Sequence, residues 1–316
     1  MRRYRHCWIS LILVAMTLAL APPALAQTCT VSITSMSFGT DVDTLTGSAT
    51  DTTATLDYNC TGEGTERVLI CVYLGEGSVP ASGNRRMSNG SGDFLSYNLY
   101  SDAERSVVWG SAGSGTPPPI VAQLTGGTAS GQAIIYGRVF GSQFSTPPAS
   151  YASTFSGGDI NALYRVTEDN DCTTPSGTQA SSSPFYVTAA VAKECLVTTA
   201  PVSFGAHGIL KSNVDAEGAV NVRCTPATDY SIRLDGGDAA AAPVARQMSR
   251  GAATITYGLY RDDARDLPWG ETEGATVIGS GNGTVQSHAV YGRVPPQTTP
   301  APGLYTDTVI VTVDYH

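Results

Sequence analysis

The sequence repeats itself, and this repeat limits the possible fold more than any other feature. Cys29 begins one copy and Cys195 the other, and in both copies a Phe-Gly pair starts nine residues after the cysteine, at Phe38 and Phe204. Further matches follow in the same order: residues 95–100 with 255–260, Trp109 with Trp269, 136–139 with 291–294, and Tyr151 with Tyr305. The offset drifts only from 166 to 154 residues, as expected when insertions lie in loops. The chain is therefore expected to contain two copies of one domain.

Strand patterns recur in both copies. Residues 230–234, 254–260 and 308–315 alternate apolar and polar side chains between turns rich in Gly, Pro and Asp, which is the period of a strand with one buried face. No segment shows a convincing helical period. The pattern predicts an all-β chain of two tandem immunoglobulin-like β-sandwiches, an N-terminal domain at residues 27–192 and a C-terminal domain at 193–316.

The first residues have the composition of an export signal. Three arginines form a basic start, residues 8–20 are apolar, and residues 24–26 read Ala-Leu-Ala before Gln27. This order predicts a signal peptide at residues 1–26 and an exported chain. The apolar run is too short to cross a bilayer, and no later segment is apolar enough to do so. No membrane insertion is therefore expected.

Six cysteines remain once Cys7 leaves with the signal peptide. They are Cys29, Cys60, Cys71, Cys172, Cys195 and Cys224. An even number in an exported chain predicts three disulfides. The repeat makes Cys29–Cys60 and Cys195–Cys224 equivalent pairs and leaves Cys71 to pair with Cys172, although six cysteines by themselves allow other pairings. No pair has CxxC spacing and no histidine lies near one, so neither a zinc site nor any cofactor is expected.

The two copies end differently. After a sixth strand region at residues 151–166, the first copy continues through a polar loop to a further apolar strand at 185–192. The second copy has the equivalent region at 305–315, followed by His316. The second sandwich is therefore predicted to lack its last strand, which leaves a groove into its core and an unpaired edge. The residues expected at the edge of this groove are Val309, Val311 and Val313.

Taken together, these features resemble the spore coat protein U domain family, which includes subunits of archaic chaperone–usher pili of the Csu type. The resemblance covers both copies. It rests on the early cysteine with its Phe-Gly, the second cysteine about 30 residues later, a Leu-x-Tyr-x-Leu-Tyr strand, Trp-Gly, Tyr-Gly-Arg-Val and a final alternating strand. It implies donor-strand complementation, in which a strand of the next subunit fills the groove of an incomplete sandwich after a periplasmic chaperone has filled it.

The resemblance also implies a place in the fibre. Pilins of this kind carry a donor extension before the first cysteine, whereas only Gln27 and Thr28 would precede Cys29 here. A subunit that accepts a strand and has none to donate must stand at one end of the fibre. The expected function is that of a pilus tip adhesin in adhesion and biofilm formation, exported through the periplasm to the cell surface. The expected partners are the chaperone, an outer-membrane usher and the adjacent pilin subunit.

Residues shared by both copies are expected to serve the scaffold. Trp109 and Trp269 are assigned to core packing, and Arg138 and Arg293 to buried hydrogen bonds. Residues that bind a surface should instead be confined to loops of the first copy, because a loop residue without a counterpart is free to serve another purpose. The candidate adhesive residues are Pro118, Ile120, Phe140 and Phe144, together with the stretch 168–183.

The composition disfavours other classes of function. Without the signal arginines the chain has 15 basic and 27 acidic residues, a net charge near −12, which is unfavourable for binding nucleic acid or anionic lipid. The three remaining histidines lie outside any nucleophile motif, and no glycine loop for phosphate is present, so the chain is not expected to be an enzyme. Two alternatives stay open: a secreted coat or matrix structural protein, and a secreted β-sandwich carbohydrate-binding protein.

Overall fold

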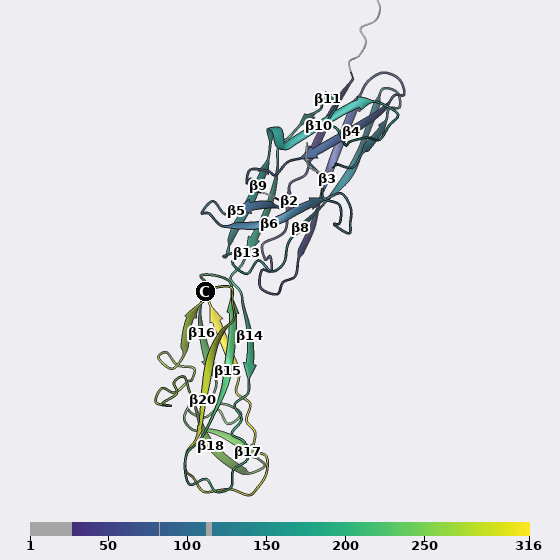
Figure 1. Ribbon diagram of the computed structural model, residues 1–316. Helices are drawn as coiled ribbons and strands as arrows, with labels where there is room; N and C mark the ends of the chain where they lie inside the picture. Colours follow the sequence, from purple (N-terminus) through teal and green to yellow (C-terminus); the bar gives the residue numbers. More distant parts are fainter. Residues whose placement is uncertain (1–26, 82, 112–115) are drawn as a thin grey trace, which may run out of the picture.

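The computed structural model describes residues 27–81, 83–111 and 116–316, so the predicted signal peptide lies outside the described residues. The strands form two domains that lie end to end, the first coloured purple to teal and the second green to yellow (Figure 1). The first domain has a nine-stranded sheet in the order β12-β1-β3-β8-β6-β5-β9-β13-β2 and a four-stranded sheet in the order β11-β10-β4-β7. The second has a five-stranded sheet, β14-β15-β20-β18-β17, and a three-stranded sheet, β19-β16-β21.

The bounds of the elements are as follows. The first domain contains β1 (Thr28–Ile33), β2 (Met36–Ser37), β3 (Thr50–Thr61), β4 (Arg67–Leu74), β5 (Arg85–Ser88), β6 (Phe94–Tyr100), β7 (Ile120–Gln123), β8 (Thr128–Val139), β9 (Ala149–Phe155), the short 3-10 turn η1 (Gly157–Asp159), β10 (Ile160–Val166), β11 (Thr178–Gln179), β12 (Ser181–Ser182) and β13 (Phe185–Val191). The second contains β14 (Cys195–Ala200), β15 (Val214–Cys224), β16 (Asp229–Leu234), β17 (Arg246–Arg250), β18 (Ala253–Tyr260), β19 (Val277–Ser280), β20 (Gln286–Val294) and β21 (Val311–Tyr315).

Each domain has a core between its two sheets. In the first domain Val72 of β4 and Ile135 of β8 come from different sheets and are fully buried in one apolar cluster. In the second, Ile232 of β16 and Val290 of β20 meet in the same way. Alternation of apolar and polar residues produces this arrangement, because successive side chains of a strand point to opposite faces of its sheet. The all-β, two-domain fold predicted from the sequence is therefore confirmed.

The repeat in the sequence is also a repeat in the structure. β3 pairs antiparallel with β8 in the first domain, and β15 pairs with β20 in the second. Trp109 and Trp269 are both fully buried, as expected for core residues. Each indole N–H donates to a carbonyl of the facing sheet, that of Val72 at 2.7 Å and that of Ile232 at 3.0 Å. These shared bonds fix how the residues of one domain correspond to those of the other.

The expectation that Arg138 and Arg293 make buried hydrogen bonds is wrong. Arg138 and Arg293 are half-buried, and each forms a bidentate ion pair on the outer face of its sheet. Arg138 binds Asp51 at 2.7 and 2.8 Å, and Arg293 binds Asp215 at the same two distances. These side chains point outward because their neighbours in the strand point into the core.

The buried hydrogen-bonding arginines are a different pair, Arg85 and Arg246, which the sequence pattern did not single out. Arg85 donates to the carbonyls of Gly75, Leu74 and Trp109 and to Asn98 Oδ1, at 2.6 to 2.8 Å. Arg246 makes the corresponding bonds to the backbone carbonyls of Leu234, Asp235, Pro243 and Trp269. Burial lowers the pKa of both guanidinium groups, yet they stay charged because the pKa of an arginine starts so high. Both tie strand ends of the two sheets together.

Three disulfides cross-link the domains internally. Cys29–Cys60 joins β1 to β3, and Cys195–Cys224 joins β14 to β15 at the equivalent place. Cys71–Cys172 joins β4 to the connection between β10 and β11, and it has no counterpart in the second domain. These are the pairs that the repeat predicts.

The last strand region of the second domain is shorter than predicted. The sequence pattern favours one strand over residues 305–315, but β21 begins only at Val311. The segment before it pairs with β17 at a single bridge, between Thr306 and Ser249. In the first domain the matching residues form β9, which pairs with β13 along its whole length. The second domain has no described strand in the place of β13, so its segment lacks the partner that would hold it extended.

Candidate functional site

β13 closes the first domain by lying between two strands from opposite ends of that domain's sequence. It runs antiparallel to β9, from the pair Phe185↔Phe155 to the pair Val191↔Ala149, and parallel to β2. Backbone bonds continue beyond β2: Phe38 N–H donates to the Thr188 carbonyl at 2.9 Å, and Ala190 N–H donates to the Gly39 carbonyl at 3.0 Å. β13 therefore satisfies the backbone of both neighbours.

The side chains of β13 that point inward complete the core. Phe185, Val187, Ala189 and Val191 alternate with more exposed residues and are at most 4% exposed. The Phe185 ring stacks on the Phe155 ring, with centroids 4.6 Å apart. The first domain thus shows what a strand in this place must offer: an apolar face with a bulky residue first and smaller residues after it.

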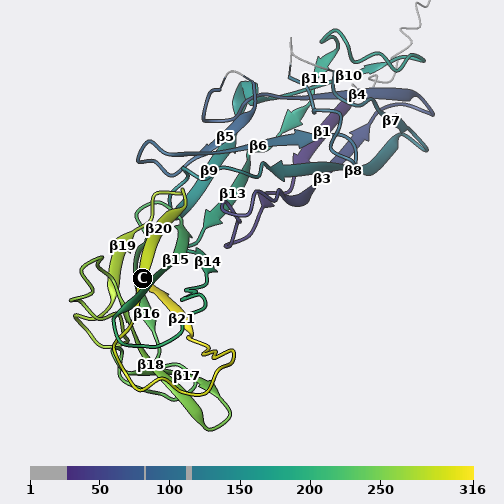
Figure 2. The same ribbon diagram turned by 60° about the horizontal axis from the view of Figure 1, so that its bottom comes forward.

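The second domain has an open groove in the place of β13. The groove has a volume of about 1310 Å³, and its two walls are the segments 199–210 and 299–311. The first wall matches the residues around β2, and the second matches β9. In Figure 2 the yellow chain that leads to β21 follows the margin of the second domain. The floor consists of apolar residues of the core, including Leu234, Leu259 and Val290.

The burial of equivalent residues shows which side chains of the second domain lack a cover. Four side chains that are buried in the first domain have equivalents in the second that line the groove and are only half-buried. The pairs are Met87 and Met248, Leu95 and Ile255, Tyr151 and Tyr305, and Phe38 and Phe204. Away from the groove Trp109 and Trp269 are equally buried, whereas Val197 of β14 is 39% exposed and the equivalent Val31 of β1 is 3% exposed. The four half-buried side chains lie where β13 would cover them.

The valines predicted at the groove edge lie on one face of the chain. Val309, Val311 and Val313 are all half-buried and pack against the second core. Val309 and Val311 line the groove, whereas Val313 lies farther along β21, opposite Ile232, and does not line it. Val309 stands where the first domain has Phe155, so this part of the groove is wider than its counterpart.

One carboxylate lines the groove, and it is held by two donors. Tyr257 Oη donates to Asp307 Oδ2 at 2.6 Å, and Asp238 N–H donates to Asp307 Oδ1 at 2.8 Å. Burial raises the pKa of Tyr257 above its ordinary value, and the hydrogen bond to Asp307 raises it further. The tyrosine therefore keeps its proton, and this donor remains in place at any physiological pH. The rest of the groove presents mainly apolar side chains.

The structure removes one of the candidate adhesive residues. Ile120 begins β7 and is buried against the core of the first domain, so it cannot touch an external surface. The Pro-rich run before it resembles a loop, but β7 pairs with β4 as β19 pairs with β16 in the second domain. Pro118 and Phe140 are half-buried.

Phe144 lies at the junction of the two domains. The guanidinium of Arg223, on β15 of the second domain, lies 4.7 Å from the centre of the Phe144 ring. Arg223 also donates to the Leu45 carbonyl of the first domain at 3.2 Å. A cation over an aromatic face is attracted to it, so the structure assigns Phe144 a contact within the chain. Nothing in the local sequence around Phe144 indicates a partner that is so distant along the chain.

Other kinds of site find no support within the described ranges. No three His, Cys, Asp or Glu side chains gather there as they would to hold a metal ion. Nor does this part of the chain contain a helix of the length and apolarity needed to cross a membrane.

Comparison with known proteins gives a consistent picture. The family model described as Spore Coat Protein U domain matches residues 14–157 and 181–312. Protein U of Myxococcus xanthus is 34% identical over 106 residues, which is 31% of this chain and 59% of that protein. The chain thus matches somewhat more than half the length of this curated relative.

Among solved structures, the fold is similar to a complex of Acinetobacter baumannii. It is described as the CsuC–CsuE chaperone–tip adhesion subunit pre-assembly complex from archaic chaperone–usher Csu pili, with a TM-score of 0.50, 14% identity, and coverage of 91% of this chain and 100% of that one. The CupB6 tip adhesin of Pseudomonas aeruginosa matches with a TM-score of 0.36 and 11% identity over 91% of this chain and 94% of that one. The second likeness is too low to carry an argument.

Proposed function

This chain belongs to the Spore Coat Protein U domain family, and from that premise we propose that it is the adhesive tip subunit of a surface pilus, whose second domain is completed by a strand from another chain. The observation that carries the proposal is the contrast between two equivalent domains. One holds β13 in its closing position, and the other has an apolar groove of about 1310 Å³ there.

The partner strand follows from the first domain. It runs antiparallel to the segment 303–309 and parallel to the segment 202–204, as β13 does with the equivalent residues. Its backbone bonds reach Phe204 N–H and Gly205 C=O, which stand where Phe38 and Gly39 bind β13. Main-chain bonds supply affinity in such strand addition, and alternate side chains in the groove supply specificity.

We assign the groove to two successive occupants. The first is a strand of a periplasmic chaperone, supported by the likeness of the fold to a tip subunit solved in complex with its chaperone. The second is the N-terminal strand of the adjacent pilin, delivered at an outer-membrane usher. If cleavage leaves Gln27 at the N-terminus, as the signal pattern predicts, β1 follows almost at once. The subunit then has no strand to donate and caps the fibre.

The adhesive surface is proposed at the end of the first domain away from the second. The connections 62–66 and 124–127 meet there, because Gly62 N–H donates to the Gly127 carbonyl and Gly127 N–H to the Gly64 carbonyl. The connection after β10 reaches the same end, through Thr167 N–H to the Arg67 carbonyl. Figure 1 shows β4, β10 and β11 far from the second domain.

Strand acceptance is tested with the full chain from Gln27 and a labelled synthetic peptide of residues 184–192. The peptide is expected to bind, because its inward side chains already fit an equivalent groove. A peptide with Val187→Asp is the matched control and is expected not to bind, since it would bury an unpaired carboxylate. Equal binding of both peptides, or of neither, would show that the groove is not a strand acceptor.

The place of adhesion is tested on beads coated with the peptide-completed chain. Thr65 and Thr174 are exposed on the connections at the outer end, and replacing both by Arg is expected to reduce retention of the beads on the target surface. Ser145→Arg, in an exposed position near the domain junction, is the control. Loss of retention only with Ser145→Arg would place adhesion elsewhere.

The match to Protein U keeps one rival function in view, that of a coat or matrix protein. Such a protein would have to be stable without a chaperone. A full chain that stays monomeric and resists proteolysis when exported alone would favour this rival.

A further inference from the structure

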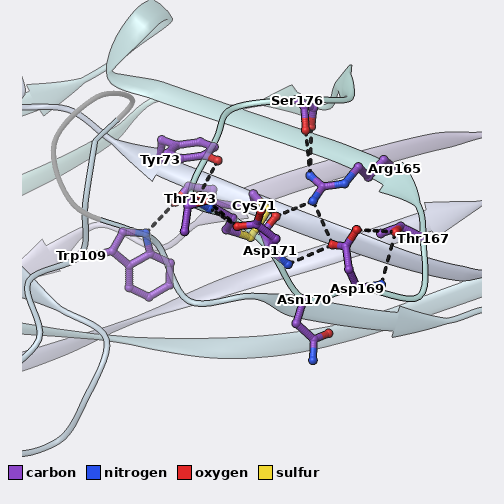
Figure 3. Close-up of a disulfide and its surroundings, with 12 residues drawn as sticks. Cys71, Tyr73, Trp109, Arg165, Thr167, Asp169, Asn170, Asp171, Thr173 and Ser176 are labelled. Atoms are coloured by element: carbon purple, nitrogen blue, oxygen red, sulfur yellow. Dashed lines mark hydrogen bonds and ion pairs between the residues drawn. A yellow bond between two sulfur atoms is a disulfide. The ribbon is translucent and has the colours of Figure 1, made fainter.

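The disulfide Cys71–Cys172 forms part of a structure that only the first domain has. Cys71, Leu69 and Tyr73 point to the outer face of β4, and all three are at most 1% exposed because the connection 167–177 covers them. Tyr73 Oη donates to the Cys172 carbonyl at 2.8 Å. Figure 3 shows the disulfide between this tyrosine and the turn at Asp171.

Two arginines also bind the connection 167–177 through hydrogen bonds. Arg67 donates to the carbonyls of Thr167 and Asp169, at 2.5 and 2.8 Å, and to Asn170 Oδ1. Arg165 donates to Asp169 Oδ1 at 3.0 Å and to Ser176 Oγ at 3.1 Å (Figure 3). We call the disulfide, Tyr73, Arg67 and Arg165, with the connection 167–177, the clamp.

The clamp lies directly before the closing strand. Cys172 is 13 residues ahead of Phe185, and the intervening chain forms β11 against β10 and β12 against β1. A β13 that leaves its groove therefore stays tethered at Cys172, with residues 173–184 as the longest connection that can come free. Without the clamp the freed segment would start at the end of β10 and be longer and less restricted.

The second domain lacks the clamp as well as the strand. Shared bonds of the tryptophans align Val72 with Ile232, so the outer face of β16 has Asp229, Ser231 and Arg233 where β4 has Leu69, Cys71 and Tyr73. Arg233 forms an ion pair with Asp314 there instead. The domain that keeps its own closing strand is thus the one that carries the clamp.

We propose that the clamp keeps β13 in its own domain and so prevents it from leaving to fill the open groove of a second copy of this chain. The repeat makes such a strand swap possible, because β13 fits a groove equivalent to the open one. A swap within one chain is blocked by length, since only residues 192–194 separate β13 from β14. A swap between copies has no such block. A cross-link near β13 opposes it by raising the local concentration of the strand at its own groove.

The test is hydrogen exchange of the full chain from Gln27, in wild type and in the double variant Cys71→Ser, Cys172→Ser. Serine is the residue that the second domain has in place of Cys71. In the variant, amides of β13 are expected to exchange at least about 30-fold faster, the lower end of what one disulfide contributes, while amides of β8 keep their protection. The matched control is Cys29→Ser, Cys60→Ser, which removes a disulfide of the same domain outside the clamp.

The proposed role of the clamp is refuted if β13 and β8 lose protection together in the double variant. It is also refuted if the control speeds the exchange of β13 amides as much as the double variant does. Arg67→Gln provides a milder second variant should the first not fold. It leaves the disulfide intact and is expected to raise β13 exchange selectively.

The swap itself is read by size-exclusion chromatography of the same variant. Oligomers that disappear when Val187→Asp is added support the whole proposal, which rests on the proposed function of the groove. Selective loosening of β13 without oligomers supports the clamp and counts against the groove as a strand acceptor.

Discussion

Giving the second domain its own closing strand should convert it into a stable unit. The change adds residues 166–192, with Cys172→Ser, after His316 in the fragment 193–316. The connection length is right, because Tyr315 pairs with β16 as Tyr164 pairs with β4. The added chain can then reach the groove as it does in the first domain.

The magnitude follows from the inward side chains of β13. Phe185, Val187 and Val191 each gain about 1.5–3 kcal/mol on full burial, or about 5–9 kcal/mol together before the cost of ordering the strand. Part of this is missing in the second domain, since Val309 replaces Phe155 and the ring stack is lost, at about 0.5–1.5 kcal/mol. A net rise in the free energy of unfolding of at least about 3 kcal/mol is expected, which is a rise in Tm of roughly 6–12 °C for a domain of this size.

The assay is thermal and urea unfolding of the fragment with and without the added strand. The unmodified fragment is expected to melt at a lower temperature by this margin, or to aggregate. The control carries Val187→Asp in the added strand and should behave like the unmodified fragment, because the carboxylate would be buried without a partner. If the fragment 193–316 is a cooperative monomer by itself and the added strand changes nothing, the reasoning from the groove is refuted.

Three further predictions concern the first domain. Val187→Asp in the full chain is expected to destabilise it by at least about 3 kcal/mol in urea unfolding, whereas Thr188→Asp on the outer face should cost less than about 1 kcal/mol; equal effects would contradict the closing role of β13. Arg85→Met leaves four acceptors without their donor and should cost at least about 3 kcal/mol, which calorimetry would measure, and an unchanged Tm would contradict it. The hydrogen bond from Arg138 lowers the pKa of Asp51, so this pair stabilises the fold above about pH 4 and loses its effect as pH falls through the lowered pKa; Asp51→Asn should remove that part of the acid dependence, worth under about 1 kcal/mol at this exposed site.

The sequence predicts the fold better than it predicts which residues of the loops are exposed. The repeat predicted the domain number, the strand-rich cores and the three cysteine pairs, because equivalent residues have equivalent environments in both domains. It could not predict that Phe144 packs under Arg223, since that contact joins two domains and has no counterpart within either. The position of Ile120 could have been found from the pattern of β19, which is the second domain's equivalent of β7.

The cover on the outer face of β4 has a signal in the local sequence. β4 has an unbroken apolar run from Val68 to Leu74, which is typical of a strand covered on both faces. Its alternate residues Leu69 and Tyr73 face away from the sandwich core. Such a run indicates a cover on the outer face, which the connection 167–177 provides. The equivalent strand β16 alternates, and its outer face is free of such a cover.

The short linker between the domains has a mechanical consequence. Residues 192–194 join β13 directly to β14, so tension that pulls the second domain away enters the first domain through its closing strand. β13 is antiparallel to β9 along its whole length, and a pull along its axis loads those bonds in shear, all at once, rather than unzipping them one by one. The strand that completes the first domain is therefore also the element through which it bears load.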